Sequence, residues 1–147
     1  MSDKAIFIRG VAGLVPDDDN AKEALQGVPI GALVACEVSR PRNLRHHRLF
    51  WKLCSSIGEA CGVHREAVAN VIKLRTGHTT TVKTKNGLHE FPKSISFAKM
   101  DQGQFSAFFN DACAIVCSEF VPNMKPSQLR DEILRMAGVP VETPEAA

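Results

Sequence analysis

Residues 43–61 read N-L-R-H-H-R-L-F-W-K-L-C-S-S-I-G-E-A-C and show a clear helical pattern of apolar and charged residues. Its apolar side chains recur at i, i+3, i+4, i+7 and i+11, a spacing that places them on one face of an α-helix. They are Phe50, Leu53, Cys54, Ile57 and Cys61. The pattern predicts a helix over residues 43–61 with one face buried in a core.

The opposite face of this helix is basic. Arg45, Arg48 and Lys52 follow one another at three- and four-residue spacing, so they stack along one side of the helix. Like charges at this spacing repel each other and cost about 0.2–0.5 kcal/mol per pair. No acidic residue stands among them to neutralise the repulsion. The arrangement therefore predicts a face turned toward an anion.

Before this helix, the sequence predicts two strands and one helix. Residues 6–9 form a short strand, and Asp17-Asp18-Asp19 supply the N-cap and first-turn anions of a helix that ends at Gly27. Residues 30–38 carry apolar side chains on both alternating faces, which is typical of a strand in the middle of a sheet.

After the basic helix, three more helices are expected. The first spans residues 63–75, where apolar side chains again follow helical spacing. Asp101 and Gln104 form a capping box that begins the main core helix. Ser127 caps a last helix, which stops at Gly138.

A β-hairpin is predicted between residues 79 and 97. Its turn is Asn86-Gly87, because both residues tolerate positive φ. Pro92 cannot donate a hydrogen bond to a neighbouring strand, so the second strand is expected at a sheet edge. The turn sets the register as Val82 opposite Phe91 on the core face and Lys83 opposite Glu90 on the solvent face.

These elements predict an α+β fold in the order β-α-β-α-α-β-β-α-α, with a small, mostly antiparallel sheet packed by helices. The chain has 147 residues, and a chain of that length buries about two thirds of its unfolded surface. We therefore expect one domain over residues 1–139, followed by a disordered tail over residues 140–147. The N-terminus lacks a signal peptide and no apolar run reaches the ~20 residues of a membrane helix. A cytoplasmic protein with no membrane partner is expected.

The net charge of +2 conceals an uneven distribution. Residues 40–99 hold twelve Arg or Lys against three acids, whereas the rest of the chain holds six against thirteen. A basic middle between acidic ends is typical of a surface that binds a polyanion such as nucleic acid. A solvated mixed surface is the alternative interpretation. The predicted phosphate contacts are Arg40, Arg42, Arg45, Arg48, Lys52, Lys83, Lys85 and Lys93.

The histidines and cysteines give no complete catalytic or metal-binding pattern. The five cysteines fall inside apolar patterns, which predicts reduced cysteines in a core. Cys61 and His64 have a C-x-x-H spacing without a second pair, so we predict no metal and no other cofactor. No catalytic residue is predicted. The alternative is a metal-dependent nuclease built on His46, His47 and His89.

Two stretches resemble a family of phage and prophage proteins of unknown function. Residues 40–53 read R-P-R-N-L-R-H-H-R-L-F-W-K-L, and residues 91–101 read F-P-K-S-I-S-F-A-K-M-D. Members of that family begin a helix with R-N-x-x-x-H-R-x-x-[FW]. They carry the segment K-S-I-S-F-A-K-M-D before a helix that contains Phe.

More distantly, the order of elements resembles the NinB (Orf) recombination mediators of lambdoid phages. The chain departs from that family in its hairpin and in lacking a Trp-rich C-terminal segment. The resemblance implies single-stranded DNA binding, a homodimer, and a recombinase or single-strand-binding protein as partner. The residues that match are Arg48 and Trp51 in the basic helix, then Ser94, Ser96, Met100 and Phe105.

The sequence thus predicts a phage-type DNA-binding accessory protein of recombination or replication, which binds single strands through its basic helix and hairpin. Two alternatives belong to other classes. One is the His-based nuclease, and the other is a protein-binding inhibitor or adaptor directed at a host factor. Trp51 is expected in the core, although a place near the surface would let it stack on bases.

Overall fold

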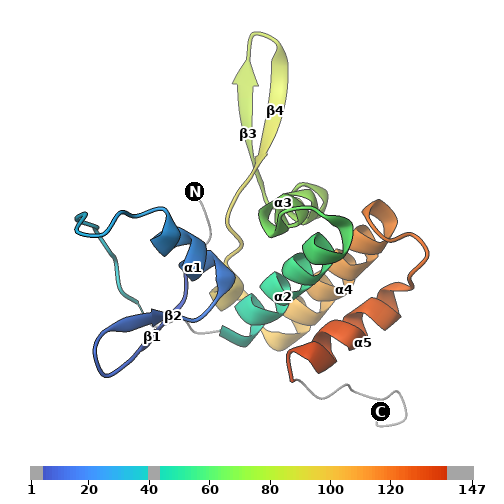
Figure 1. The fold of residues 1–147 in the computed structure, drawn as a ribbon. Coiled ribbons are helices and arrows are strands. Elements are labelled where there is room, and N and C mark those ends of the chain that lie inside the picture. Colours follow the sequence, from blue (N-terminus) through green and yellow to red (C-terminus); the bar gives the residue numbers. More distant parts are fainter. Residues whose placement is uncertain (1–4, 40–43, 139–147) are drawn as a thin grey trace. The chain divides into compact units, whose positions relative to one another are not determined.

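The computed structural model describes residues 5–39 and 44–138. The chain divides into two compact units, residues 1–40 and 41–147, and each is described by itself. The fold is α+β, as predicted, with five helices and two two-stranded antiparallel sheets in the described ranges (Figure 1). The predicted tail lies outside those ranges. One domain over residues 1–139 stays a prediction.

A short hairpin and one helix form the regular structure of the first unit. Strand β1 (Phe7–Arg9) pairs antiparallel with β2 (Leu14–Pro16), and α1 (Asp19–Gln26) follows. As predicted, Asp18 caps this helix, and its Oδ1 accepts a hydrogen bond from the Ala21 N–H at 2.8 Å. The sequence does not predict β2, because three residues are too few to show an alternating pattern.

The predicted central strand over residues 30–38 is wrong. This segment has no regular structure, and its large apolar side chains, such as Ile30 and Leu33, are fully exposed. A strand is stabilised by hydrogen bonds to a neighbouring strand, and none of the described strands pairs with this segment. An alternating pattern shows which residues are apolar, but it does not show that a neighbouring strand is present to pair with them. The observed order is therefore β-β-α-α-α-β-β-α-α.

Four helices build the core of the second unit. The predicted apolar stripe of the second helix, apart from Cys61, is buried in one cluster with side chains of the fourth helix, and the ring centroids of Phe50 and Phe108 lie 5.9 Å apart. The prediction for Cys61 is wrong, because it belongs to the predicted stripe and is exposed. None of the described helices is long and apolar enough to cross a lipid bilayer. The four are α2 (Leu44–Cys61), α3 (Arg65–Thr76), α4 (Gln102–Glu119) and α5 (Pro126–Met136).

Local capping explains where these helices begin and end. The predicted box at α4 is confirmed: Asp101 Oδ1 accepts from the Gln104 N–H at 2.7 Å, and Gln104 Oε1 accepts from the Asp101 N–H at 2.9 Å. Helix α3 ends at Gly77, whose φ of 80° suits glycine. The predicted cap Ser127 is wrong, since α5 already begins at Pro126. A proline at the first helical position has the required φ and needs no N–H.

The second hairpin is confirmed, but its register differs from the prediction by two residues. Strand β3 (Thr79–Thr84) pairs with β4 (Gly87–Pro92), and Lys85-Asn86 forms the turn. A shift of two keeps every side chain on its predicted face, because side chains alternate with period two. The observed pairs include Val82 with His89, Lys83 with Leu88, and Thr81 with Glu90.

Thr84 accounts for this register. Its Oγ1 accepts a hydrogen bond from the Asn86 N–H at 3.2 Å, which fixes the turn one residue earlier than predicted. Only glycines have positive φ in the described chain, and Gly87 is one of them at 115°. Asn86 therefore does not adopt the conformation that an Asn-Gly two-residue turn requires.

This hairpin stands out from the helices (Figure 1). Every residue from 80 to 91 is exposed. Val82 and Phe91, which were predicted to face a core, are 43% and 53% exposed. The chain rejoins the core at Ile95 and Phe97, which are buried. The prediction that Val82 and Phe91 face a core is therefore wrong, since only the root of the hairpin is anchored by buried side chains.

Candidate nucleic-acid interface

The basic face of α2, defined by Arg45, Arg48 and Lys52, lies where the sequence predicts it. Arg45 and Arg48 are exposed and Lys52 is half-buried, while the buried residues of α2 occupy the opposite side. No acidic residue occurs in the first turn of α2. The predicted contacts Arg40 and Arg42 lie outside the described residues.

The direction of α2 raises the positive potential of this face. Backbone dipoles give the N-terminus of a helix a positive partial charge, so cations there are unfavourable by about 0.3–1 kcal/mol each. Arg45 stands in the first turn of α2, whereas Glu59 stands in its last turn. Both charges oppose the dipole. A bound anion at the N-terminal end would remove the unfavourable interaction.

The hairpin lysines form a second basic group. Lys83 and Lys85 are exposed near the turn, and Lys93 is exposed where the chain leaves β4. The register places Leu88, and not Glu90, opposite Lys83. The end of the hairpin therefore has no acid in its cross-strand pairs from Lys83 to the turn. The hairpin also exposes an aromatic ring, that of Phe91.

His46, His47 and His89 do not form a metal site. His46 is buried, stacks on Phe105 with centroids 4.0 Å apart, and donates from Nε2 to Gln102 Oε1 at 3.3 Å. His89 lies on the hairpin, with Nε2 at 3.0 Å from Thr84 Oγ1. No group of three His, Cys, Asp or Glu in the described residues could hold a metal ion. Nothing in this arrangement favours the nuclease alternative.

Trp51 and the C-x-x-H pair have structural roles. Trp51 is buried in the core, as expected, so it is not available for base stacking. His64 is the N-cap of α3, and its Nδ1 accepts a hydrogen bond from the Glu66 N–H at 3.1 Å. Among the cysteines, burial, with a smaller contribution from neighbouring Cys117, raises the pKa of Cys113 to about 12. That thiol stays protonated at neutral pH and is a poor nucleophile.

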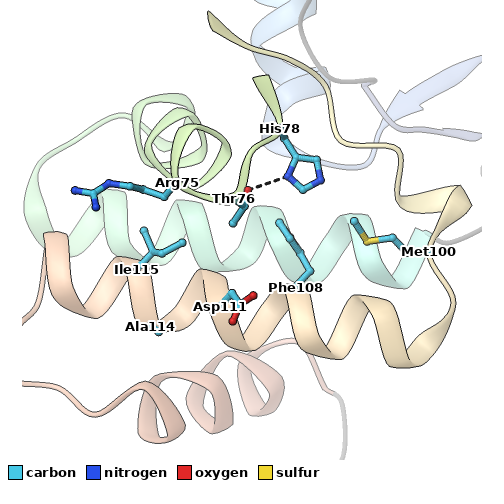
Figure 2. Close-up of a pocket in the computed structure, with 8 residues that line it drawn as sticks. All are labelled: Arg75, Thr76, His78, Met100, Phe108, Asp111, Ala114 and Ile115. Atoms are coloured by element: carbon cyan, nitrogen blue, oxygen red, sulfur yellow. Dashed lines mark hydrogen bonds between the residues drawn. The ribbon is translucent and has the colours of Figure 1, made fainter. Parts of the chain in front are cut away.

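A pocket lies at the root of the hairpin, between the end of α3 and one side of α4 (Figure 2). Its volume is about 570 Å³, and Met100, Phe108 and Ile115 give it apolar walls. Four polar side chains border the same space, those of Arg75, Thr76, His78 and Asp111 (Figure 2). The sequence does not predict this pocket, because its residues come from separate elements and share no motif.

His78 is held in a defined orientation. Its Nδ1 lies 2.8 Å from Thr76 Oγ1, and its ring meets the Phe108 ring edge to face with centroids 5.4 Å apart. Its carbonyl oxygen accepts a hydrogen bond from the Lys93 N–H at 3.0 Å, which closes the hairpin at its root. Burial lowers the pKa of His78, and the positive charges of Lys93 and Lys73 lower it further. The imidazole is therefore neutral at pH 7.

Comparison with known proteins gives one structural likeness. No family model matches the chain, and no curated protein matches it. A NinB structure from structural genomics is similar, with 22% sequence identity, coverage of 87% of this chain and 98% of that chain, and a TM-score of 0.41. This is the distant likeness to NinB that the sequence predicts, and we draw no functional conclusion from it. The two phage-family motifs stay a prediction.

Proposed function

We propose that this chain binds DNA without cleaving it, favours single strands, and acts as an accessory protein of phage recombination or replication. The basic face of α2 makes the leading phosphate contacts. Lys83 and Lys85 near the hairpin turn, with Lys93 at its exit, extend the surface. Arg40 and Arg42, which precede α2 in the sequence, belong to the same proposed surface.

The observation that carries the proposal is a stack of cations that begins at the positive end of a helix whose first turn holds no acidic residue. Arg45 and Arg48 repel each other, and Arg45 also opposes the helix dipole. Both costs fall when a phosphate approaches, since its negative charge interacts favourably with the side chains and with the dipole. Each phosphate neutralised in this way also releases condensed counterions, which drives binding at low salt.

The preference for single strands rests on the hairpin. On this projecting ribbon Leu88 is 70% exposed opposite Lys83, and Phe91 is 53% exposed opposite Thr80, nearer the root. An aromatic ring can stack on a base whose face is uncovered, and that occurs in a single strand. In a duplex the faces are already stacked on neighbouring base pairs. The hairpin therefore offers more contact to a single strand than to a duplex.

The recombination setting follows from the sequence resemblance to the NinB mediators. That resemblance also implies a homodimer, and a recombinase or single-strand-binding protein as the partner of the DNA-bound form. Arg48 and Trp51 carry the match in α2. In this chain Trp51 supports the helix from the core side, while Arg48 is on the exposed side that we assign to DNA.

Fluorescence anisotropy of a labelled single strand and of a matched duplex, at low and moderate salt, tests the proposal. For the double variant Arg45→Glu/Arg48→Glu we expect affinity for the single strand to fall at least about tenfold at low salt, because repulsion replaces two phosphate contacts. The slope of log affinity against log salt should fall by about 2. The unmodified chain should bind the single strand more tightly than the duplex.

The matched control is Lys22→Glu/Arg135→Glu. It makes the same change in net charge at exposed positions on α1 and α5. The control should keep most of the affinity, whereas equal losses in both double variants would mean that net charge alone governs binding. Cleavage of the strand in the presence of magnesium would favour the nuclease alternative. No binding at low salt would overturn the proposal and favour a protein partner.

A further inference from the structure

The pocket at the root of the hairpin fits a small planar ligand. Its volume of about 570 Å³ falls within the range of roughly 300–1,000 Å³ that is usual for ligand sites. The side chains of Met100, Phe108 and Ile115 face this space and form its apolar walls (Figure 2). Such walls suit a flat ring, and the polar groups between them then determine which ring is bound.

Thr76 fixes which nitrogen of His78 carries the proton. The Thr76 hydroxyl lies 2.8 Å from the carbonyl oxygen of Ile72, and a carbonyl can only accept, so the hydroxyl donates its hydrogen there. Its oxygen is also 2.8 Å from His78 Nδ1, and in that bond it must accept. Nδ1 is therefore protonated, and Nε2 of the neutral ring is left as a hydrogen-bond acceptor.

The second polar group of the pocket is also an acceptor. Asp111 lies one turn along α4 from Phe108, on the same side of the helix (Figure 2). Its carboxylate is exposed and makes no ion pair with the described residues. The cation at the rim, Arg75, is engaged by Glu119 instead. The pocket therefore presents two acceptors, which call for a ligand rich in N–H donors.

We infer that this pocket holds one base of the bound DNA strand, and that it selects bases with an exocyclic amino group. Adenine, cytosine and guanine each present an amino group as a donor to the Asp111 carboxylate or to His78 Nε2. Thymine presents carbonyl oxygens on both sides of its single N–H, and these would repel the carboxylate. Lys93 is exposed, and its backbone N–H donates to the His78 carbonyl, so its side chain would contact the phosphate of the same nucleotide.

This inference rests on the proposed DNA binding and is tested with four labelled oligonucleotides. One is oligo-dT, and the others carry a single central dA, dC or dG in the same strand. For the unmodified chain we expect at least about fivefold tighter binding of the strands with an amino base, the lower end of the discrimination expected of a side-chain contact to a base edge. In Asp111→Asn this preference should be lost. The affinity for oligo-dT should not fall, because the carboxylate that this substitution removes repels the thymine carbonyls.

Glu132→Gln is the matched control, since it removes one exposed carboxylate from α5 without altering the pocket. His78→Gln is the second pocket variant and should lose the same preference. Equal binding of all four strands, or a preference that survives in Asp111→Asn, would overturn the inference while leaving the proposed function intact. Failure of every strand to bind at low salt would overturn the proposed function and the pocket assignment together.

Discussion

The helices and the hairpin of the second unit use apolar residues in opposite ways. In α2 and α4 the apolar stripes are buried against each other, and Phe50 and Phe105 are at most 2% exposed. In the hairpin, Val82, Leu88 and Phe91 are 43%, 70% and 53% exposed. Periodicity shows which side chains share a face in both regions. It does not show whether another element covers that face. In the helices the apolar face is covered and stabilises the fold, whereas in the hairpin it is exposed and available to a partner.

The largest effect should come from Phe105→Ala. Phe105 is buried and its ring lies against His46, Phe97 and Phe109, with the His46 centroid at 4.0 Å. Loss of a buried aromatic ring leaves a cavity and typically costs about 3–5 kcal/mol. Urea unfolding followed by far-UV circular dichroism measures the change in unfolding free energy. A cost below ~1 kcal/mol would mean that the ring cluster does not hold α2 against α4.

A smaller loss is expected for Gly58→Ala, where α2 passes close to the chain that leads into α3. A Cβ at Gly58 would lie 2.4 Å from the Val63 carbonyl oxygen, and this is backbone that cannot rotate away. The Gly58 carbonyl also accepts the Val63 N–H at 2.9 Å, so the two segments are bonded at this point. Overpacking of this kind costs about 1–3 kcal/mol.

The control for Gly58→Ala is Gly103→Ala in the first turn of α4. A Cβ there meets only the Asp101 Oδ1, at 3.4 Å. Alanine favours a helix over glycine by up to ~1 kcal/mol, so this variant should be neutral or slightly more stable in the same urea experiment. Destabilisation of both variants to the same extent would show that the loss at Gly58 does not come from the close backbone approach.

Most of the helical body could be predicted from the sequence because its determinants are local. The stripe of α2 and the capping box at Asp101 and Gln104 each depend on residues within a few turns of one another. The basic face of α2 was predictable for the same reason. The strand over residues 30–38 was not, because pairing depends on a partner elsewhere in the chain, and the described strands do not provide one.

The pocket is the part of the site that sequence patterns could not show. His78 follows α3 and Asp111 lies on α4, so the two are 33 positions apart and meet only through the packing of those helices. The sequence around each of these two residues shows no apolar pattern or motif that indicates a ligand. The proton position on His78 depends on Thr76 and on the carbonyl of Ile72, a chain of hydrogen bonds that exists only once α3 has formed.

The smallest effect on stability is expected for Leu88→Ser on the hairpin. Leu88 is 70% exposed and lies opposite Lys83, so its removal from water contributes little to folding. Surface substitutions of this kind usually change the unfolding free energy by less than about 0.5 kcal/mol. The matched substitution in the body, Leu53→Ser, replaces a side chain with 0% exposure and should destabilise the chain severely. The same urea experiment measures both.

The value of Leu88→Ser is that it separates stability from binding. If the fold does not need Leu88, then an exposed leucine opposite Lys83 is explained better by contact with a partner than by packing. Affinity for single-stranded DNA should then fall about two- to fivefold, within the range for loss of part of one base contact, while unfolding stays unchanged. A loss of stability as large as that of Leu53→Ser would remove the distinction between the two regions. The hairpin would then be part of the core, and the assignment of its lysines to DNA contacts would have to be abandoned.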